Sequence, residues 1–287
     1  MKLSVFVVTY NQEKYIRQCL DSILMQKVDF DYEVVIGEDH GTDGTRAICE
    51  EYAKKYPQVR LLPLTENLGI ARNWQRVLSE CNGEYIAMCE GDDYWTNSLK
   101  LQKQVDFLEQ HEQYELCFHK VTVTSFREEE THMFDHLENR AYSDREIYDK
   151  WTILTSSVMY RNNKEYYSFP PEIKFPDTYL FLKIMNRKQA YCLNINATVY
   201  RRTEQSQSSF LTIQLTQSLF HQYKLMVLEF PHLKDISIRL RNKYLDMLCG
   251  LNGRACLIYR FYKMLYEPKY IFSRYGLKTM CVLLFGK

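Results

Sequence analysis

Residues 3–24, LSVFVVTYNQEKYIRQCLDSIL, join a short apolar run to a longer pattern of helical period. Leu3–Val8 contains three valines, which is typical of a strand buried on both faces. Asn11 is a suitable N-cap for a helix after this strand. The apolar positions of that helix recur at helical spacing: Tyr15, Ile16, Cys19, Leu20, Ile23 and Leu24. The stretch therefore predicts a β-strand that leads into an amphipathic helix.

The same pair of elements recurs three times in the next part of the chain. Further strands are predicted at Glu33–Gly37, Val59–Leu62 and Glu84–Cys89, and further helices over about 43–56, 70–81 and 98–111. Asp43 and Thr45 are the expected cap and first turn of the second helix. Alternation of this kind predicts an α/β fold, Rossmann-like, with a mostly parallel sheet and helices on both faces.

The length and charge of the chain indicate how it is divided. Its 287 residues, at 34.5 kDa, suffice for one large domain with an appendage. We predict a catalytic domain over residues 1–210 and a mainly helical C-terminal extension over 211–287. The formal net charge of +1 excludes a nucleic-acid-binding polycation. The extension is basic and aromatic from residue 254, with seven Lys or Arg and one Glu.

The cysteines and the hydropathy pattern indicate the compartment. The chain has nine cysteines, and no two are spaced as a CxxC pair. Most lie in apolar segments, where a thiol acts as a small hydrophobe, and this suits a reducing compartment. No apolar stretch approaches the roughly 20 residues that a membrane span needs. The expected location is the cytoplasm, either free or peripheral on the inner face of the cell membrane.

Polar or acidic residues follow each of the first four predicted strands. They are Thr9–Asn11, Glu38–Thr45, Glu66–Gly69 and Glu90–Trp95. Taken singly, each stretch is adequately explained as a turn or a helix cap. Because ligands of open parallel sheets bind beyond the carboxyl ends of the strands, four such stretches on one edge predict a ligand site there.

Four motifs in order resemble the family 2 glycosyltransferases. They are VFVVTYNQEKYIRQCLDSILMQ at residues 5–26, EVVIGEDHGTDGT at 33–45, ENLGIARN at 66–73 and GEYIAMCEGDDYW at 83–95. A weaker resemblance continues to about residue 210. The resemblance implies the A-type glycosyltransferase fold, which binds nucleotide sugars, and a typically inverting reaction.

The resemblance also assigns roles to the acidic turn, Glu90–Asp93. Asp93 is the expected direct metal ligand, with Asp92 on the metal or the donor. Glu90 stands where the family often has Asp. The implied cofactor is Mn²⁺ or Mg²⁺, since hard oxygen ligands suit either ion and a divalent cation stabilises a departing diphosphate.

The donor is expected along the same edge, with a UDP-sugar as the predicted nucleotide sugar. Thr9 and Asp39 match family positions that contact base and ribose, and Tyr10 offers a stacking face. The full predicted donor-binding set is Thr9, Tyr10, Asn11, Glu38, Asp39, Arg72, Asn73, Asp92 and Arg202. Solvent exposure is an equally good account of Arg72, and of Arg202 and its neighbour Arg201.

Asp177 is the predicted general base of the reaction. An inverting transfer needs a group that takes the proton of the attacking acceptor hydroxyl. Asp177 follows Phe175-Pro176 and opens a predicted helix, where the family places its base. Simple helix capping by Asp177 is the competing interpretation.

The predicted function is transfer of a sugar to a saccharide or lipid-linked acceptor in cell-surface polysaccharide synthesis. A sugar-nucleotide nucleotidyltransferase and a non-catalytic nucleotide-sugar-binding subunit are the alternatives. The intact Asp92-Asp93 pair disfavours the second of these.

The basic, aromatic segment 254–287 predicts contact with an anionic membrane surface. The alternative is that this segment packs on the catalytic domain or on a second subunit, as in a homo-oligomer.

Overall fold

The computed structural model describes residues 1–287 except 125–129, 132–133, 135, 204–211, 250–253 and 267–287. The chain divides into two compact units. The first comprises residues 1–171 and 175–209, and the second comprises 172–174 and 210–287. That catalysis resides in residues 1–210 remains a prediction.

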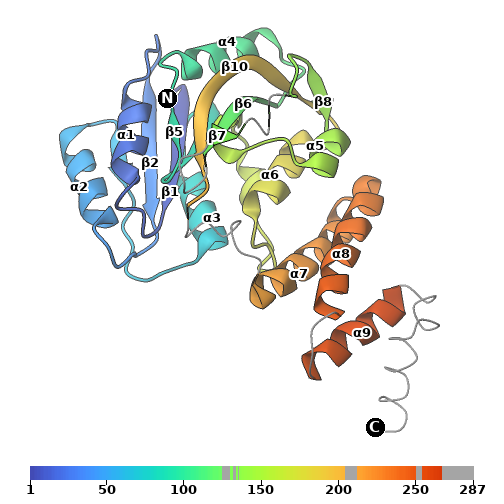
Figure 1. The fold of residues 1–287 in the computed structure, drawn as a ribbon. Coiled ribbons are helices and arrows are strands. Elements are labelled where there is room, and N and C mark those ends of the chain that lie inside the picture. The colour runs from blue at the N-terminus through green and yellow to red at the C-terminus, as the bar shows by residue number, and fades with distance from the viewer. Residues whose placement is uncertain (125–129, 132–133, 135, 204–211, 250–253, 267–287) are drawn as a thin grey trace. The chain divides into compact units, whose positions relative to one another are not determined.

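A mixed, mostly parallel sheet forms the centre of the first unit (Figure 1). Its strand order is β3-β2-β1-β4-β9-β6-β10-β5. The bounds in that order are Val59–Leu61, Tyr32–Glu38, Leu3–Thr9, Tyr85–Glu90, Met159–Arg161, Leu116–Thr124, Gln189–Arg201 and Tyr94–Trp95. The first four strands are mutually parallel, β9 is antiparallel to both of its neighbours, and β10 is parallel to β6. Two short strands, β7 (Glu130–Thr131) and β8 (Ala141–Ser143), pair with β6 and β10.

Helices cover both faces of the sheet, as the alternation of elements predicts. They are α1 (Ile16–Leu24), α2 (Thr45–Lys55), α3 (Ile70–Glu80), α4 (Lys100–Gln110), α5 (Asp144–Lys150) and α6 (Pro176–Met185), with 3₁₀ turns η1 (Thr155–Ser157) and η2 (Lys164–Tyr167). Side chains alternate along β1, so Val5 and Val7 share a core with α1, α2 and α4. Phe6 faces the other way and meets Trp74 of α3 at 4.9 Å between ring centroids.

The prediction that Asn11 caps the first helix is wrong. Helix α1 begins at Ile16, and its N-cap, Tyr15, makes no capping bond. Asn11 has φ 52°, a left-handed conformation that asparagine tolerates well. Its Oδ1 instead accepts a hydrogen bond from the backbone N–H of Thr42 at 2.7 Å. Asn11 therefore joins the loops that follow β1 and β2.

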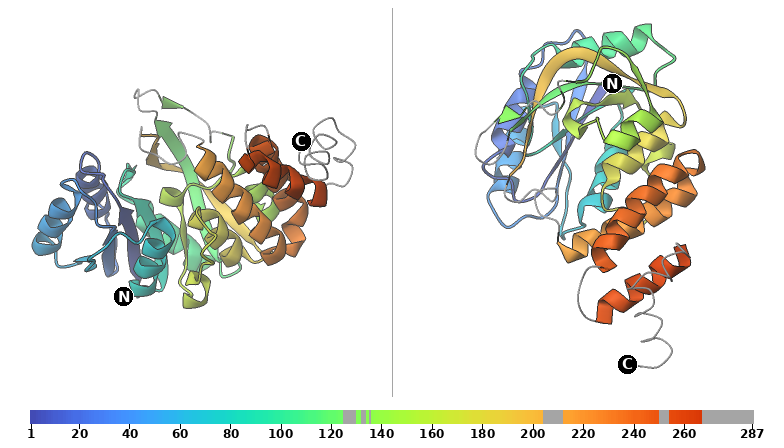
Figure 2. Two further views of the ribbon diagram at one scale, coloured as in Figure 1. Left: turned by 90° about the horizontal axis from the view of Figure 1, so that it is seen from below. Right: turned by 45° about the vertical axis from the view of Figure 1, so that its right-hand side comes forward.

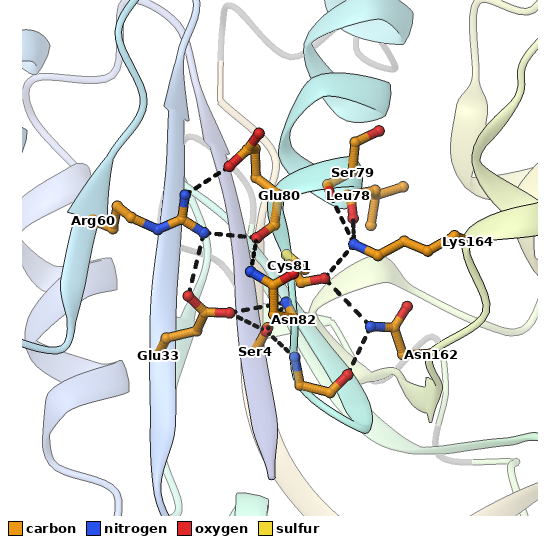
Figure 3. A network of polar contacts seen from close by, with 11 residues as sticks. Ser4, Glu33, Arg60, Leu78, Ser79, Glu80, Cys81, Asn82, Asn162 and Lys164 are labelled. Atoms are coloured by element: carbon orange, nitrogen blue, oxygen red, sulfur yellow. Dashed lines mark hydrogen bonds and ion pairs between the residues drawn. The ribbon is translucent and has the colours of Figure 1, made fainter. Parts of the chain in front are cut away.

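A polar network ties the amino ends of β1, β2 and β4 together (Figure 3). Glu33 accepts hydrogen bonds from the Ser4 hydroxyl at 2.7 Å and from the Asn82 backbone N–H at 2.9 Å, and it pairs with Arg60 at 3.3 Å. Lys164 donates to backbone carbonyls at the C-terminal end of α3. These contacts lie at the edge opposite the predicted site, and their role is structural.

Glu33→Gln is expected to lower the free energy of unfolding by about 1–2 kcal/mol near neutral pH, because the charged acceptor of three donors is lost. Burial raises the pKa of Glu33, but the bonds from Ser4, Asn82 and Arg60 outweigh it and hold the pKa below its usual range. A depressed folded-state pKa gives stability that is present above the unfolded pKa and is lost as pH falls through the folded pKa. Urea unfolding should therefore show a difference between wild type and variant that shrinks in acid. A difference independent of pH would contradict this account.

The second unit is a small helical assembly in which α7 (Ile213–Glu229) and α8 (Lys234–Cys249) pack side by side (Figure 2). They are joined through the 3₁₀ turn η4 (Pro231–Leu233), and α9 (Arg254–Tyr266) packs against α8. Phe220, Leu245 and Leu248 form the core. Tyr259, Tyr262 and Tyr266 of α9 pack against it.

These contacts bear on the predicted membrane surface. Arg260 donates to the carbonyl of Cys249, Lys263 pairs with Asp246, and Arg241 lies 4.0 Å from the ring centroid of Tyr266. The described aromatic and basic side chains of α9 thus make packing contacts inside the second unit, and contact with a membrane surface, with the catalytic domain or with a second subunit stays a prediction. Residues 267–287 lie outside the described residues. No helix in the described part of the chain is both long and apolar enough to cross a membrane.

Candidate active site

The strand register brings the predicted site residues to one edge of the sheet. Thr9 at the end of β1 stands opposite Glu38 at the end of β2. On the other side of β1, Val8 stands opposite Glu90 at the end of β4. The loops after these three strands therefore start next to one another, at the edge where parallel α/β sheets bind ligands.

Four carboxylates from two distant segments gather at this edge. Burial first, and then the charges of Asp92, Asp93 and Asp177, raise the pKa of Glu90 well above its usual range. Asp177 is thus close enough to repel Glu90, although it lies on α6. The Thr155 hydroxyl opposes the rise by donating to Glu90. Such a concentration of negative charge is stable only with protons, cations or hydrogen-bond donors nearby.

Asp93 is the most enclosed of the four. Its side chain is fully buried, and its Oδ1 accepts a hydrogen bond from the backbone N–H of Arg201 at 3.0 Å. Its Oδ2 is buried and has no hydrogen-bond partner among the described residues. Burial and the charge of Asp92 raise the pKa of Asp93 well above its usual range, while the Ser156 hydroxyl beside it acts in the opposite direction.

The acidic turn fits a hard divalent cation. The unpartnered oxygen of Asp93 and the half-buried carboxylate of Asp92 are ligands that Mg²⁺ and Mn²⁺ prefer. In the described part of the chain, no three His, Cys, Asp or Glu side chains are grouped so as to hold a metal ion alone. A cation held here therefore needs further ligands, and substrate phosphates commonly complete sites of this kind.

Asp177 lies in the first turn of α6 rather than at its N-cap. Helix α6 begins at Pro176, so Asp177 is its second residue, and the N-cap, Phe175, makes no side-chain capping bond. The Thr178 backbone N–H supports the carboxylate of Asp177, but Oδ1 is buried without a partner. Burial raises the pKa of Asp177 to about 6. A carboxylate with this pKa is ionised near neutral pH and basic enough to take a proton.

Arg201, at the end of β10, contacts the acidic turn. Its guanidinium donates to the Asp92 carbonyl at 2.7 Å and to the side chain of Gln18, and it lies 4.3 Å from the ring centroid of Tyr94. Arg202, the residue named in the predicted donor-binding set, is exposed. Successive side chains of an extended chain point to opposite sides, so Arg201 is the arginine that faces the turn. The donor-binding role of Arg202 remains a prediction.

Asp39, which is predicted to bind the donor, also makes structural contacts. Its two carboxylate oxygens accept the backbone N–H groups of Leu68 and Gly69, each at 2.9 Å. Burial raises its pKa despite these bonds. Asp39 therefore fixes the Glu66–Gly69 loop, and a ribose would have to share oxygens that already accept these bonds.

The other predicted donor contacts differ in their exposure. Asn73 is buried and donates to the Gly37 carbonyl at 2.8 Å, whereas Arg72 is exposed. Glu38 is fully buried and accepts from the Gly41 backbone N–H at 2.6 Å. Tyr10 is 48% exposed, which leaves its ring available for a base.

Three polar residues that sequence reasoning missed line the same edge. The Thr9 hydroxyl donates to Gln12 Oε1 at 2.8 Å, and the Gln12 side chain also bonds to Asp92. Gln12 thus links the end of β1 to the acidic turn. Thr155 and Ser156 are the other two, beside Glu90 and Asp93.

Comparison with known proteins gives the family. The sequence profile described as Glycosyl transferase family 2 matches residues 4–165. The chain belongs to this family. The matched segment contains β1 to β4, the acidic turn, Thr155 and Ser156, and it ends before Asp177.

The chain is similar in sequence to bacterial proteins. An uncharacterized protein of Mycobacterium tuberculosis is 39% identical over 202 residues, which are 70% of this chain and 58% of that protein. Poly(ribitol-phosphate) beta-N-acetylglucosaminyltransferase TarS of Staphylococcus aureus is 31% identical over 188 residues, 63% of this chain and 32% of TarS. The chain thus spans less than two thirds of the length of either relative.

Solved structures confirm the predicted fold. TarS residues 1–349 of S. aureus, in complex with UDP-GlcNAc, superpose with a TM-score of 0.64 at 21% identity, over 97% of this chain and 79% of that one. Mannosyltransferase PcManGT from Pyrobaculum calidifontis, in complex with GDP-Man and Mn²⁺, gives 0.58 at 18% identity, over 100% and 88%. The family 2 chain described here therefore has the A-type glycosyltransferase fold.

Proposed function

We propose that this chain transfers one sugar, with inversion, from a nucleotide-diphosphate donor to a hydroxyl of a saccharide or lipid-linked acceptor in cell-surface polysaccharide synthesis. The observation that carries the proposal is the meeting of an unpartnered Asp177 oxygen with the acidic turn at the carboxyl edge of the sheet. Family membership and the donors named for TarS and PcManGT support it. A UDP-sugar is the proposed donor.

In this mechanism Asp177 accepts the proton of the acceptor hydroxyl. The acceptor oxygen forms a bond to the anomeric carbon as the bond from that carbon to the phosphate oxygen breaks, and the nucleoside diphosphate leaves. Attack from the face opposite the leaving group inverts the anomeric configuration. Such a displacement needs a proton acceptor and a site for the diphosphate. In this proposal Asp177 is the proton acceptor, and the acidic turn, which comes from a separate segment, binds the diphosphate.

Asp92 and Asp93 are the residues that would hold Mn²⁺ or Mg²⁺. When bound, the ion supplies positive charge to the departing diphosphate. Arg201 adds a second, permanent positive charge at the same turn, and its guanidinium can donate charge-assisted hydrogen bonds to phosphate oxygens. Tyr94 and Tyr15 lie against the guanidinium and restrict where it can move.

Nucleotide binding with a divalent cation tests the donor half of the proposal. UDP in large excess over its dissociation constant should raise the free energy of unfolding by about 2–4 kcal/mol through mass action. The gain should require Mn²⁺ or Mg²⁺ and should exceed that given by GDP or CDP. Thermal unfolding measures it. Equal and metal-independent shifts with all three nucleotides would contradict a specific UDP site.

Product analysis separates the enzyme from its alternatives. Incubation with UDP-GlcNAc and Mn²⁺ should release UDP slowly even without an acceptor, since water can replace the acceptor hydroxyl. Release of pyrophosphate from a nucleoside triphosphate and a sugar phosphate would indicate a nucleotidyltransferase. Tight nucleotide-sugar binding with no turnover would indicate a binding subunit.

A further inference from the structure

Trp151 has an unusual backbone conformation, and its side chain is partly exposed to solvent. It ends α5 with φ 45° and ψ 83°, a left-handed conformation that glycine and asparagine adopt far more readily than a bulky residue. Its side chain is half-buried. A residue held in a costly conformation often marks a functional position, because selection keeps the side chain despite the strain.

The ring of Trp151 lies beside the helix that carries Asp177. It is nearly parallel to the ring of Phe181, with an angle of 8° between the planes and 6.4 Å between the centroids. Phe181 is fully buried in α6 and follows Asp177 by four residues, so the two side chains lie on the same side of the helix, one turn apart. The indole is therefore held against a rigid helix, one turn from the proposed base.

The chain after Trp151 runs directly to the other carboxylates. Four and five residues later, Thr155 donates to Glu90 and Ser156 lies beside Asp93. Trp151 thus packs on the helix of Asp177 through Phe181, and it precedes by a few residues the segment that contacts the acidic turn. The donor-binding candidates Thr9, Tyr10 and Asp39 belong to different segments, those that follow β1 and β2.

We propose that Trp151 is an acceptor subsite, a platform on which a pyranose ring of the acceptor stacks while a neighbouring hydroxyl reaches Asp177. The proposal rests on the proposed transferase function and adds the class of ligand at its acceptor side. An aromatic face offers a large rigid apolar surface, which suits the C–H face of a sugar ring, and such sites are lined by aromatic side chains with few polar groups.

Tryptophan fluorescence gives a direct test, because the other two tryptophans of the chain, Trp74 and Trp95, are each only 1% exposed. Cellobiose, chitobiose and maltose serve as pyranose probes, and ribitol serves as an acyclic polyol control. We expect at least one disaccharide to shift the emission and to protect it from acrylamide quenching, and ribitol to do neither. No change with any disaccharide, or an equal change with ribitol, overturns the proposal.

Two variants separate recognition from structure. For the disaccharide that shifts the emission most, calorimetry should show Trp151→Leu weakening binding by about tenfold or more, and Trp151→Phe retaining most of the affinity. Both variants should release UDP from UDP-GlcNAc at the wild-type rate in the absence of acceptor. Unchanged disaccharide affinity in Trp151→Leu overturns the subsite. If wild type releases no UDP from any UDP-sugar, the proposed transferase function fails, whereas the fluorescence and calorimetry still decide whether Trp151 binds a sugar ring.

Discussion

Asp177→Asn is expected to lower the rate of sugar transfer by about 100-fold or more while leaving donor binding intact, the usual effect of losing a general base. Asparagine keeps the shape of the side chain but cannot take the acceptor proton. The rate should be measured with saturating donor and acceptor, and donor binding by the UDP-induced thermal shift. Glu112→Gln, an exposed residue after α4, is a matched control and should change neither.

The pH dependence gives the same assignment an independent test. Burial raises the pKa of Asp177 to about 6. The proposed mechanism requires the ionised form. Transfer by wild type should therefore fall about tenfold per pH unit below this pKa and level off above it. The small residual rate of Asp177→Asn should lack this acidic limb. An identical limb in the variant would show that another group accepts the proton.

Stability distinguishes the base from a helix cap. A raised folded-state pKa means that the contribution of Asp177 to stability is present below its unfolded pKa and is lost as pH rises through about 6. Asp177→Asn should therefore be as stable as wild type in acid and more stable near neutral pH, by about 1–3 kcal/mol at most. A cap would give the opposite sign, since replacing it costs stability. Loss of stability with unchanged transfer would contradict the catalytic assignment.

Most of the elements up to residue 111 could be predicted because their signals are local, although the two-residue strand β5 was not predicted. Apolar period predicted β1 to β4 and α2 to α4 to within two residues of their observed ends, and the parallel direction of these strands followed from the strand–helix alternation. The N-terminus of α1 could not be predicted in this way. Asn11 has the chemistry of a cap, but its side chain binds a loop 31 residues away. A tertiary contact of this kind leaves no periodic trace in the sequence.

Fewer residues of the site could be predicted from the sequence, for the same reason. Gln12, Thr155 and Ser156 are common polar residues, and only the fold shows that they meet carboxylates. Asp177 and Glu90 are 87 residues apart in the sequence, and only the fold brings them together. The choice between Arg201 and Arg202 depends on the register of β10 against β5, which the sequence does not show. Val199 pairs with Tyr94, and Arg201, two residues further on, faces the same side.

Asp93→Asn is expected to lower transfer by about 100-fold or more, and to abolish the effect of Mn²⁺ or Mg²⁺ on nucleotide binding. The Oδ2 of Asp93 is the buried carboxylate oxygen of the acidic turn without a partner, and the neutral amide offers a cation far less. Its Oδ1 can still accept the Arg201 N–H in the variant, so the turn should keep its shape. Thermal unfolding with UDP, with and without Mn²⁺, measures the binding effect separately from the rate.

The direction in which Asp93→Asn changes stability distinguishes a metal ligand from a residue that stabilises the fold. Burial and the charge of Asp92 hold the pKa of Asp93 well above its usual range, so the ionised carboxylate costs stability in the free protein. Asp93→Asn removes that cost and should unfold at the same or a higher temperature near neutral pH, even though turnover is lost. A residue kept for the fold would show the reverse. Near-normal turnover that still requires the metal would exclude Asp93 as a ligand, and the assignment would then pass to Asp92, for which Asp92→Asn is the corresponding variant.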